Sequence, residues 1–187
     1  MDVRALYSKY IETFPDETAE LRRLAEQARD LDADLTSRKN FVGHVTASAF
    51  VVHAPTGQVL LLKHAALGKM LQPGGHIEPT DRSLSAAVLR EVEEETGLAA
   101  NDLRLYPLLD DEPEVPFDID SHYIPANDKK GEPEHYHHDF RLLYTTESLD
   151  IATDPDESDG FVWMELAQLA EEVAFAGACR KITDLLR

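Results

Sequence analysis

The sequence predicts an α/β fold with a helical N-terminal extension. Three observations support this class: apolar residues recur at helical spacing in the N-terminal part, residues 45–62 have the pattern of a β-hairpin, and an amphipathic helix over 81–96 separates that hairpin from further strand candidates. A chain of 187 residues is long enough to bury a core of its own. We expect residues 1–40 to form the extension and residues 41–187 to form the main domain.

The N-terminal helix is predicted from one apolar stripe. Asp16, which follows Pro15, is a suitable N-cap. The stripe, at spacings of three and four residues, consists of Leu21, Leu24, Ala28, Leu31 and Leu35. It covers about two heptads, whereas a sustained two-helix seam needs about three or four. We therefore favour packing of this helix on its own domain, although the stripe also permits a homodimer.

The other elements are expected in the following order. Residues 45–52 are rich in small and β-branched side chains and residues 59–62 are apolar, so the two runs are expected to pair across a turn at 55–57. The helix over 81–96 ends before Gly97, a residue that favours helix C-termini. The remaining elements are strands at 103–109, 117–125, 135–145 and 161–164, a hairpin turn at 127–131, a solvated acidic loop at 154–159, and helices at 166–173 and 175–186.

The charge balance limits the partners of the protein. Lys and Arg number 18 against 36 Asp and Glu, and the net charge of −18 disfavours nucleic acid polymers and anionic membranes. For the same reason a phosphate ligand needs an accompanying cation. The single cysteine, Cys179, excludes an intramolecular disulfide and a multi-thiolate metal site. No apolar run approaches the roughly 18 residues of a transmembrane helix, and no signal-peptide pattern is present, so we expect a cytoplasmic protein.

The helix over 81–96 carries charges on the face that its apolar residues mark as inward. At about 100° per residue, this face is apolar in the first turns and acidic in the last. It comprises Leu84, Ala87, Val88, Glu91, Glu94 and Glu95. Desolvating unpaired carboxylates is costly, and a divalent cation such as Mg²⁺, which prefers oxygen ligands, removes that cost. Arg90 is placed four residues before Glu94 and is suited to orient it.

Two glycines lie in the loop before this helix. Gly74 and Gly75 permit a close approach of the backbone to a ligand, which other residues do not. Because the loop comes shortly before the acidic helix, one of its backbone carbonyls or amides is a candidate contact for a metal ion or a phosphate group.

The stretch from Gly75 to Leu98 resembles the Nudix box, whose pattern is G-x5-E-x7-R-E-U-x-E-E-x-G-U, with U a bulky aliphatic residue. The second half matches at Arg90, Glu91, Val92, Glu94, Glu95, Gly97 and Leu98. In the first half, Asp81 stands where the first glutamate is expected, and eight residues instead of seven separate it from Arg90. Counting back from Arg90 reaches Arg82, which has the opposite charge. We interpret this as one extra residue at the loop–helix junction, which leaves the role of the first carboxylate open.

The resemblance implies a fold and a reaction. It implies a Nudix domain over residues 41–187, built as an α/β/α sandwich around a mixed sheet. It also implies hydrolysis of a diphosphate linked to a moiety X, commonly in a small nucleoside diphosphate derivative. The identity of X is not readable from the sequence.

The resemblance further implies roles for the box residues. Glu91, Glu94 and Glu95 would bind Mg²⁺ or Mn²⁺, helped by a backbone oxygen near Gly75. Glu94 or Glu95 would serve as the general base, with Arg90 orienting a carboxylate. Bound metal would neutralise the phosphates, which is how so acidic a protein could accept a polyanionic substrate.

A histidine-rich strand candidate lies outside the box. Alternation over 135–145 places His135, His137 and Asp139 on one face, and this set suits a transition metal or a phosphate group. Polar residues that hydrogen-bond locally on a sheet face would show the same pattern. Glu134 and Asp139 are candidates for an additional metal-binding or basic carboxylate by position only. Further candidates, each with a competing surface or structural role, are His122, Lys63, Lys69, Arg38 and His44.

Two other functions compete with hydrolysis. A Nudix-fold sensor that binds a nucleotide-type ligand without cleaving it would tolerate the altered first half of the box. An isomerase of the isopentenyl diphosphate type, which shares this fold, relies on a cysteine ahead of its box-like helix. Cys179 instead lies on an apolar pattern in the predicted last helix, where a structural role is expected.

Overall fold

A computed structural model describes residues 1–65, 68–129, 131–153 and 158–187 of the chain. Its strands are β1 (His44–His53), β2 (Gln58–His64), β3 (Lys69–Leu71), β4 (Gly74–His76), β5 (Arg104–Leu105), β6 (Asp118–Ile124), β7 (His135–Thr146) and β8 (Ser158–Glu165). Its helices are α1 (Val3–Thr13), α2 (Arg22–Ala28), α3 (Leu84–Thr96), α4 (Leu166–Leu169) and α5 (Ala176–Leu185), with 3₁₀ turns η1 (Pro15–Thr18) and η2 (Ala100–Asp102).

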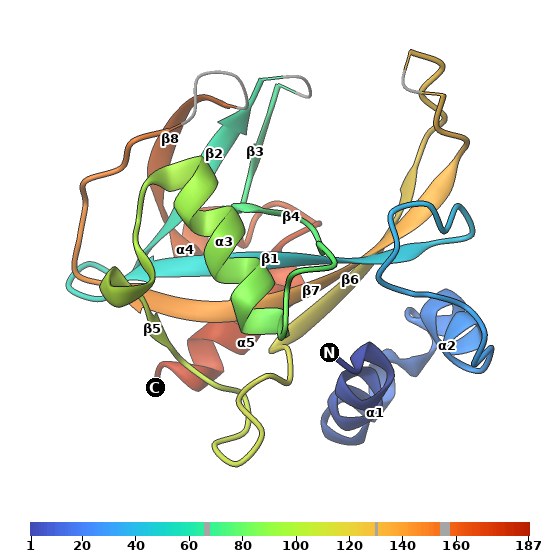
Figure 1. Ribbon diagram of the computed structural model, residues 1–187. Helices are drawn as coiled ribbons and strands as arrows, with labels where there is room; N and C mark the ends of the chain where they lie inside the picture. The colour runs from blue at the N-terminus through green and yellow to red at the C-terminus, as the bar shows by residue number, and fades with distance from the viewer. Residues whose placement is uncertain (66–67, 130, 154–157) are drawn as a thin grey trace.

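These strands form one mixed sheet. Its main path is β3-β2-β1-β7-β5, with β4 paired to β1, β6 to β7 and β8 to β2. β1 and β7 are parallel, from the pair His44–His137 to the pair His53–Thr146, and the other pairs are antiparallel. α3 lies across one face and α4 and α5 lie behind the other (Figure 1). The predicted α/β/α sandwich is therefore confirmed.

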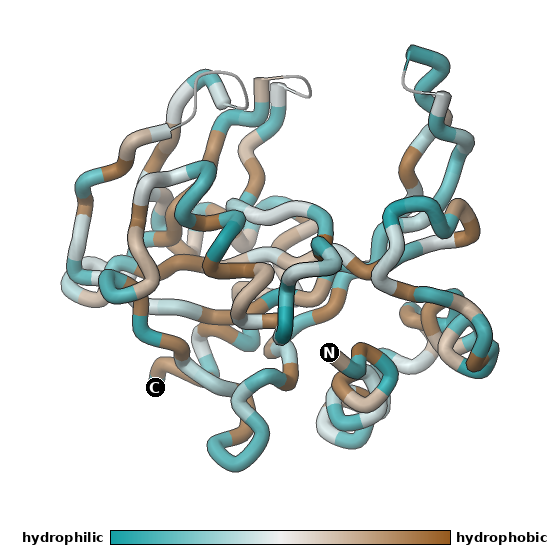
Figure 2. Tube along the Cα trace, in the orientation of Figure 1, coloured by the Kyte–Doolittle hydropathy of each residue, from teal (hydrophilic) through white to brown (hydrophobic). Residues whose placement is uncertain are grey.

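Alternate residues of β1 pack into two separate hydrophobic clusters. Val45, Ala47, Ala49 and Val51 face the cluster that contains α3. Phe50 and Val52 face the cluster that contains α4 and α5. The hydrophobic residues follow the central strands, while the hydrophilic residues concentrate in the connecting loops (Figure 2). β1 is consequently buried on both faces, as expected for a central strand with parallel pairing.

α3 begins later than predicted but ends where predicted. Its N-cap is Ser83, whose Oγ accepts a hydrogen bond from Ala86 N at 3.1 Å, so Asp81 stays in the preceding loop. Gly97 ends the helix in the left-handed conformation at φ 70°, and its N–H donates to Glu93 O. The buried face consists of Leu84, Ala87, Val88, Val92 and Thr96.

The N-terminal prediction was right about packing and wrong about the helix boundaries. Asp16 lies in η1 and does not cap α2, which begins at Arg22 and ends at Ala28. Pro15 at the first position favours this separate 3₁₀ turn. Of the apolar stripe, Leu21, Leu24 and Leu35 are buried in the cluster under α3, whereas Leu31 is 81% exposed. The stripe thus packs on its own chain.

Polar contacts also anchor the N-terminal helices. Tyr10 of α1 is fully buried, and its hydroxyl accepts hydrogen bonds from Lys181 Nζ of α5 and from Ile119 N of β6. Lys181 Nζ also lies 2.6 Å from a carboxylate oxygen of Glu17. In α2, Gln27 Oε1 accepts a hydrogen bond from His138 Nε2 at 2.7 Å.

Three further predictions differ from the structure or lie partly outside the described residues. The strand predicted at 103–109 contains only Arg104 and Leu105, because Pro107 cannot donate a ladder hydrogen bond. The acidic loop predicted at 154–159 is outside the described residues at 154–157, and Ser158 and Asp159 already belong to β8. The predicted turn at 127–131 is described except at residue 130, and Asn127 bridges to Glu132 there.

Among the described residues, no helix is both long enough and apolar enough to cross a membrane.

Candidate functional site

The box glutamates lie in the last turns of α3 and differ in exposure. The Glu91 side chain is 13% exposed, Glu95 is half-buried, and the Glu94 side chain is 58% exposed. Glu91 and Glu95 are therefore largely covered, as predicted, whereas the prediction that Glu94 also faces inward is wrong, because its side chain lies at the rim in contact with solvent. The site therefore has a buried side and an open side, and a ligand can reach the carboxylates only from the open side.

Arg90 joins the elements around these carboxylates. Its Nη1 donates to Glu91 Oε1 at 2.9 Å and to Glu94 Oε2 at 3.1 Å. Its Nη2 donates to the backbone oxygen of His76 in β4 at 2.9 Å. The hydrogen bond with Asp81 is the largest influence that raises the pKa of Arg90, and burial opposes it. Arg90 is thus a permanently charged clamp that holds two box glutamates against β4.

Asp81 has a definite role in this clamp, although the sequence left it open. Its Oδ1 and Oδ2 accept from Arg90 Nε at 3.3 Å and from Arg90 Nη2 at 3.0 Å, and Oδ2 also accepts from Glu78 N at 2.8 Å. Burial favours the neutral form of Asp81, but the hydrogen bonds from Arg90 and Glu78 outweigh it and lower the pKa. Arg82 is exposed. The extra residue therefore leaves a carboxylate in reach of Arg90.

The two glycines of β4 lie directly against the glutamates. Gly74 N donates a hydrogen bond to Glu95 Oε2 at 2.8 Å. A Cβ added to Gly75 would lie 2.6 Å from both Cδ and Oε1 of Glu91, which is closer than real Cβ contacts. Only glycine allows Glu91 to occupy this position beside the backbone. The loop thus contributes its backbone to the site, as the sequence suggested.

A second group of side chains gathers four histidines from three strands. The ring of His44 in β1 lies 5.1 Å from that of His135 and 4.7 Å from that of His137, both in β7. His76 of β4 completes the group, with ring centroids 5.2 Å from His44 and 5.3 Å from His137. We call these four residues the histidine cluster. His122 of β6 lies next to it, 5.7 Å from His137.

Burial keeps most of the histidine cluster neutral. Desolvation is the largest cause that lowers the pKa of His137, to about 2, and repulsion from neighbouring imidazoles adds to it. Desolvation likewise is the largest cause that lowers the pKa of His76, to about 4. Burial also lowers the pKa of His44. Neutral imidazole is the form that offers a lone pair to a metal ion or to a proton.

Asp139 and Glu134 are engaged away from the histidine cluster. Asp139 accepts hydrogen bonds from Thr46, Ser48 and Gln72 and forms an ion pair with Arg141 at 3.0 Å. Glu134 is exposed, and its Oε2 accepts from Tyr123 OH at 2.6 Å. Of the additional candidates, the structure therefore brings His135 and His137 together and gives both carboxylates other partners.

The candidates for phosphate contact have mainly local partners. Lys63 lies 3.5 Å from Asp159, and Arg38 lies 3.4 Å from Glu132. Lys69 is exposed. His122 Nδ1 lies 2.7 Å from Asp120 Oδ2. His44 is the exception, because it is buried in the histidine cluster.

The sequence did not predict one buried network of charged side chains. Arg141 of β7 is 5% exposed and contacts Asp118 at 2.9 Å, Asp120 at 3.4 Å and Asp139 at 3.0 Å. Lys181 of α5 adds a second cation at 2.8 Å from Asp118. An arginine among apolar residues of a strand was the only signal for it. These contacts brace β6, β7 and α5.

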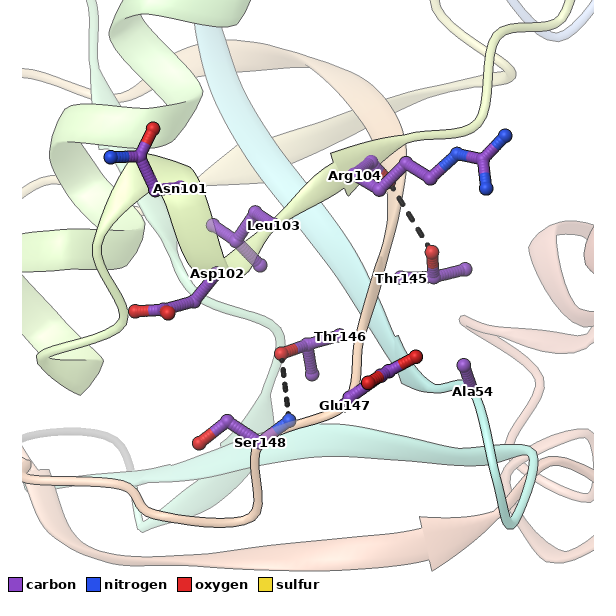
Figure 3. Close-up of a pocket in the computed structure, with 9 residues that line it drawn as sticks. All are labelled: Ala54, Asn101, Asp102, Leu103, Arg104, Thr145, Thr146, Glu147 and Ser148. Carbon is purple, nitrogen blue, oxygen red and sulfur yellow. Dashed lines mark hydrogen bonds between the residues drawn. The ribbon is translucent and has the colours of Figure 1, made fainter.

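The cavity shown in Figure 3 lies away from both groups. It has a volume of about 560 Å³ and is lined by Ala54, by residues 101–104 and by residues 145–148 at the end of β7. No predicted site residue is among the residues that line it. This cavity is therefore no part of the candidate active site.

Cys179 is buried within α5 and has no role in either group. Burial raises the pKa of its thiol to about 11, which suits a core residue and not a nucleophile. The structural role predicted for it agrees with this position, and the isomerase alternative loses its catalytic residue.

Comparison with known proteins agrees with the geometry of α3 and its loop. The family model described as the NUDIX domain matches residues 43–185 of the chain. No curated protein matches the chain. A NUDIX-family hydrolase from Clostridium perfringens is 27% identical, with a TM-score of 0.55, over 77% of this chain and 98% of that one.

Two solved structures of lower identity share the fold. The Ap4A hydrolase of C. elegans, in a binary complex, is 18% identical, with a TM-score of 0.55, over 76% of this chain and 96% of its own. The dihydroneopterin triphosphate pyrophosphohydrolase of E. coli is 15% identical, with a TM-score of 0.53, over 75% and 92% of the two chains. Because the family model covers most of the sequence, the chain belongs to the NUDIX domain family and is a Nudix-type pyrophosphohydrolase.

Proposed function

We propose that the protein cleaves the pyrophosphate bond of a nucleoside diphosphate linked to another moiety, and that it does so with Mg²⁺ or Mn²⁺. The observation that carries this proposal is the position of Glu91, packed against Gly75 and tied by Arg90 to Glu94. This arrangement holds carboxylates together beside a backbone that only glycine can supply.

The donor set suits a hard divalent cation. Glu91, Glu94 and Glu95 would hold the ion, with a backbone oxygen near Gly75, because such cations prefer carboxylate and carbonyl oxygens. The narrow space at Gly75, which any Cβ would fill, keeps the Glu91 carboxylate beside the loop. When bound, the ion neutralises phosphate charge and lowers the pKa of its water.

The chain's own residues orient these groups. Arg90 holds Glu91 and Glu94 on one side of α3, and Gly74 N–H restrains Glu95. Asp81 fixes Arg90 in turn, so the clamp is set before substrate arrives. Either Glu94, which is open to solvent, or Glu95, which is held by the loop, accepts the proton of the attacking water.

We infer a small-molecule substrate, not a nucleic acid polymer. The net charge of −18 disfavours a long polyanion, whereas a small diphosphate can arrive with its metal ion. The names of two structural neighbours point to dinucleoside polyphosphates and to nucleotide-like triphosphates as compounds to test. We further propose a cytoplasmic protein in which residues 1–40 extend a Nudix domain at 41–187. A homodimer stays a prediction, and of the N-terminal stripe only Leu31 is free for a second copy.

The test is a phosphorus NMR panel of nucleoside triphosphates, nucleotide sugars, dinucleoside polyphosphates and dinucleotide cofactors, with and without Mg²⁺ or Mn²⁺. We expect metal-dependent loss of a diphosphate signal for at least one class. Glu94→Gln and Glu95→Gln should each lower turnover by about 100-fold or more, because both residues would hold the metal ion and one of them would be the general base, which contributes about 100- to 10,000-fold. Glu93→Gln is the matched control, since Glu93 is exposed on the same helix.

The outcomes separate the competing functions. Full turnover in both the Glu94 and Glu95 variants would remove the assigned site. Ligand binding in calorimetry with no product after long incubation with metal would favour the sensor instead.

A further inference from the structure

We propose that His44, His135 and His137 form a second metal site, which binds a divalent transition-metal ion such as Zn²⁺ separately from the glutamates of α3. Each of these three residues can offer one ring nitrogen, and the three nitrogens lie within 4.8 Å of one another. His44 and His135 are buried and His137 is half-buried. Three imidazoles with an open fourth position are a common ligand set for zinc.

The strand pairing brings these residues together. His44 at the start of β1 is the parallel partner of His137 in β7, and His135 lies two residues before it on the same face. His135 Nε2 and His137 Nε2 lie 3.2 Å apart, within hydrogen-bond distance of each other. The ligands therefore come from two hydrogen-bonded central strands, which hold them at a fixed spacing.

Backbone carbonyls select the tautomers that metal binding requires. His44 Nδ1 lies 3.2 Å from Asn40 O, and His135 Nδ1 lies 2.8 Å from Pro133 O. A carbonyl only accepts hydrogen bonds, so each Nδ1 carries the proton and each Nε2 keeps its lone pair. Metal-binding histidines typically have such a carbonyl partner on the far nitrogen, where it fixes the ring.

One of these lone pairs has no hydrogen-bond partner. His44 is 1% exposed, and within the described part of the chain its Nε2 is buried without a hydrogen bond. An orphaned buried polar atom is unfavourable unless something absent from the protein chain satisfies it. A metal ion at the histidine cluster would satisfy this nitrogen and replace the close contact between the two β7 histidines.

The histidine cluster lies on the opposite face of the sheet from α3. Val45 packs under α3, so the neighbouring His44 points to the other face. Along β4, Gly75 faces Glu91, while the ring of His76 lies beside that of His44. Imidazoles favour zinc and other transition metals, whereas the carboxylates of α3 favour Mg²⁺ or Mn²⁺. The backbone oxygen of His76, whose ring lies beside that of His44, also accepts from Arg90, so β4 lies between the two groups.

The test measures zinc bound to the metal-stripped full-length protein. The protein is dialysed against micromolar ZnCl₂ with excess MgCl₂, which occupies the carboxylate site, and zinc is measured by mass spectrometry. We expect one zinc ion per chain in the wild type and at least about a tenfold loss of affinity in His44→Gln and in His137→Gln. His53→Gln is the matched control, because His53 is a buried histidine at the other end of β1. Glu95→Gln should keep its zinc.

A second measurement uses only the wild type, in case the variants do not fold. Nitrogen NMR of the imidazole rings should show His44 and His135 protonated at Nδ1, with Nε2 resonances that shift on adding zinc. Wild-type protein that binds no zinc, zinc retained in both folded cluster variants, or zinc lost equally in His53→Gln would overturn the proposal. These results leave the hydrolase proposal untouched, since that depends on the glutamates.

Discussion

Replacing Gly75 by alanine tests the geometry of the glutamate site without changing any charge. The added Cβ would lie 2.6 Å from Glu91 Cδ, and ordinary contact begins at 3.4 Å, so the carboxylate must move by about 0.8 Å. Metal–ligand distances tolerate only about 0.2 Å. Because the atom that moves is the end of a flexible side chain, we expect a stability loss of only about 1 kcal/mol.

Function should suffer far more than stability in this variant. A misplacement near 1 Å costs on the order of 100-fold in rate, so we expect kcat/KM to fall by about that factor. The affinity for Mn²⁺ should weaken by about 10- to 100-fold. Initial rates over a range of Mg²⁺ concentrations, electron paramagnetic resonance titration of Mn²⁺ and urea unfolding measure the three quantities.

Two comparisons make the result decisive. Gly177→Ala is the matched control: the new Cβ would meet only Arg180 Nη2 at 4.0 Å, within α5, so activity should not change. In a Glu91→Ala background the clash is gone, so Gly75→Ala should cost no further stability. A folded Gly75→Ala protein with wild-type turnover and Mn²⁺ affinity would refute the reasoning.

Further predictions concern the charged networks. Arg90→Lys keeps the charge but loses the planar guanidinium that bonds several acceptors at once. Urea unfolding should show that the free energy of unfolding falls by about 2 kcal/mol, less than for a fully buried ion pair. Unchanged stability would contradict the role of Arg90 as a clamp. Arg141→Met leaves three aspartates without their buried cation, so thermal and urea unfolding should show a loss of about 3–5 kcal/mol. Tyr10→Phe removes the hydroxyl that accepts from Lys181 and should cost about 1–3 kcal/mol in urea, with activity per folded molecule unchanged. The lowered pKa of Asp81 contributes stability that is present above its ordinary value of 3.8 and is lost as the pH falls through the lower folded-state value. Wild-type stability should therefore fall below about pH 4, and Asp81→Asn should fall less over the same range; parallel curves would exclude this contribution.

The sequence by itself determined the parts of the molecule that depend on local spacing. The hairpin of β1 and β2, the body of α3 and its end at Gly97 follow from hydrophobic periodicity and from the left-handed conformation of one glycine. The box glutamates share a side of α3 because helical geometry puts residues three and four apart together. Boundaries were less determined, and α3 starts at a serine cap instead of at Asp81.

Only the tertiary structure decided which distant residues meet. His44 and His137 are far apart in the chain, and the parallel register of β1 and β7, which core packing sets, makes them neighbours. The pairing of Asp81 with Arg90 depends on the path of a loop that has no repeating pattern. Burial of Arg141 depends on which face of β7 the other layer covers. Long-range contacts come from the packing of whole layers, and no local spacing encodes them.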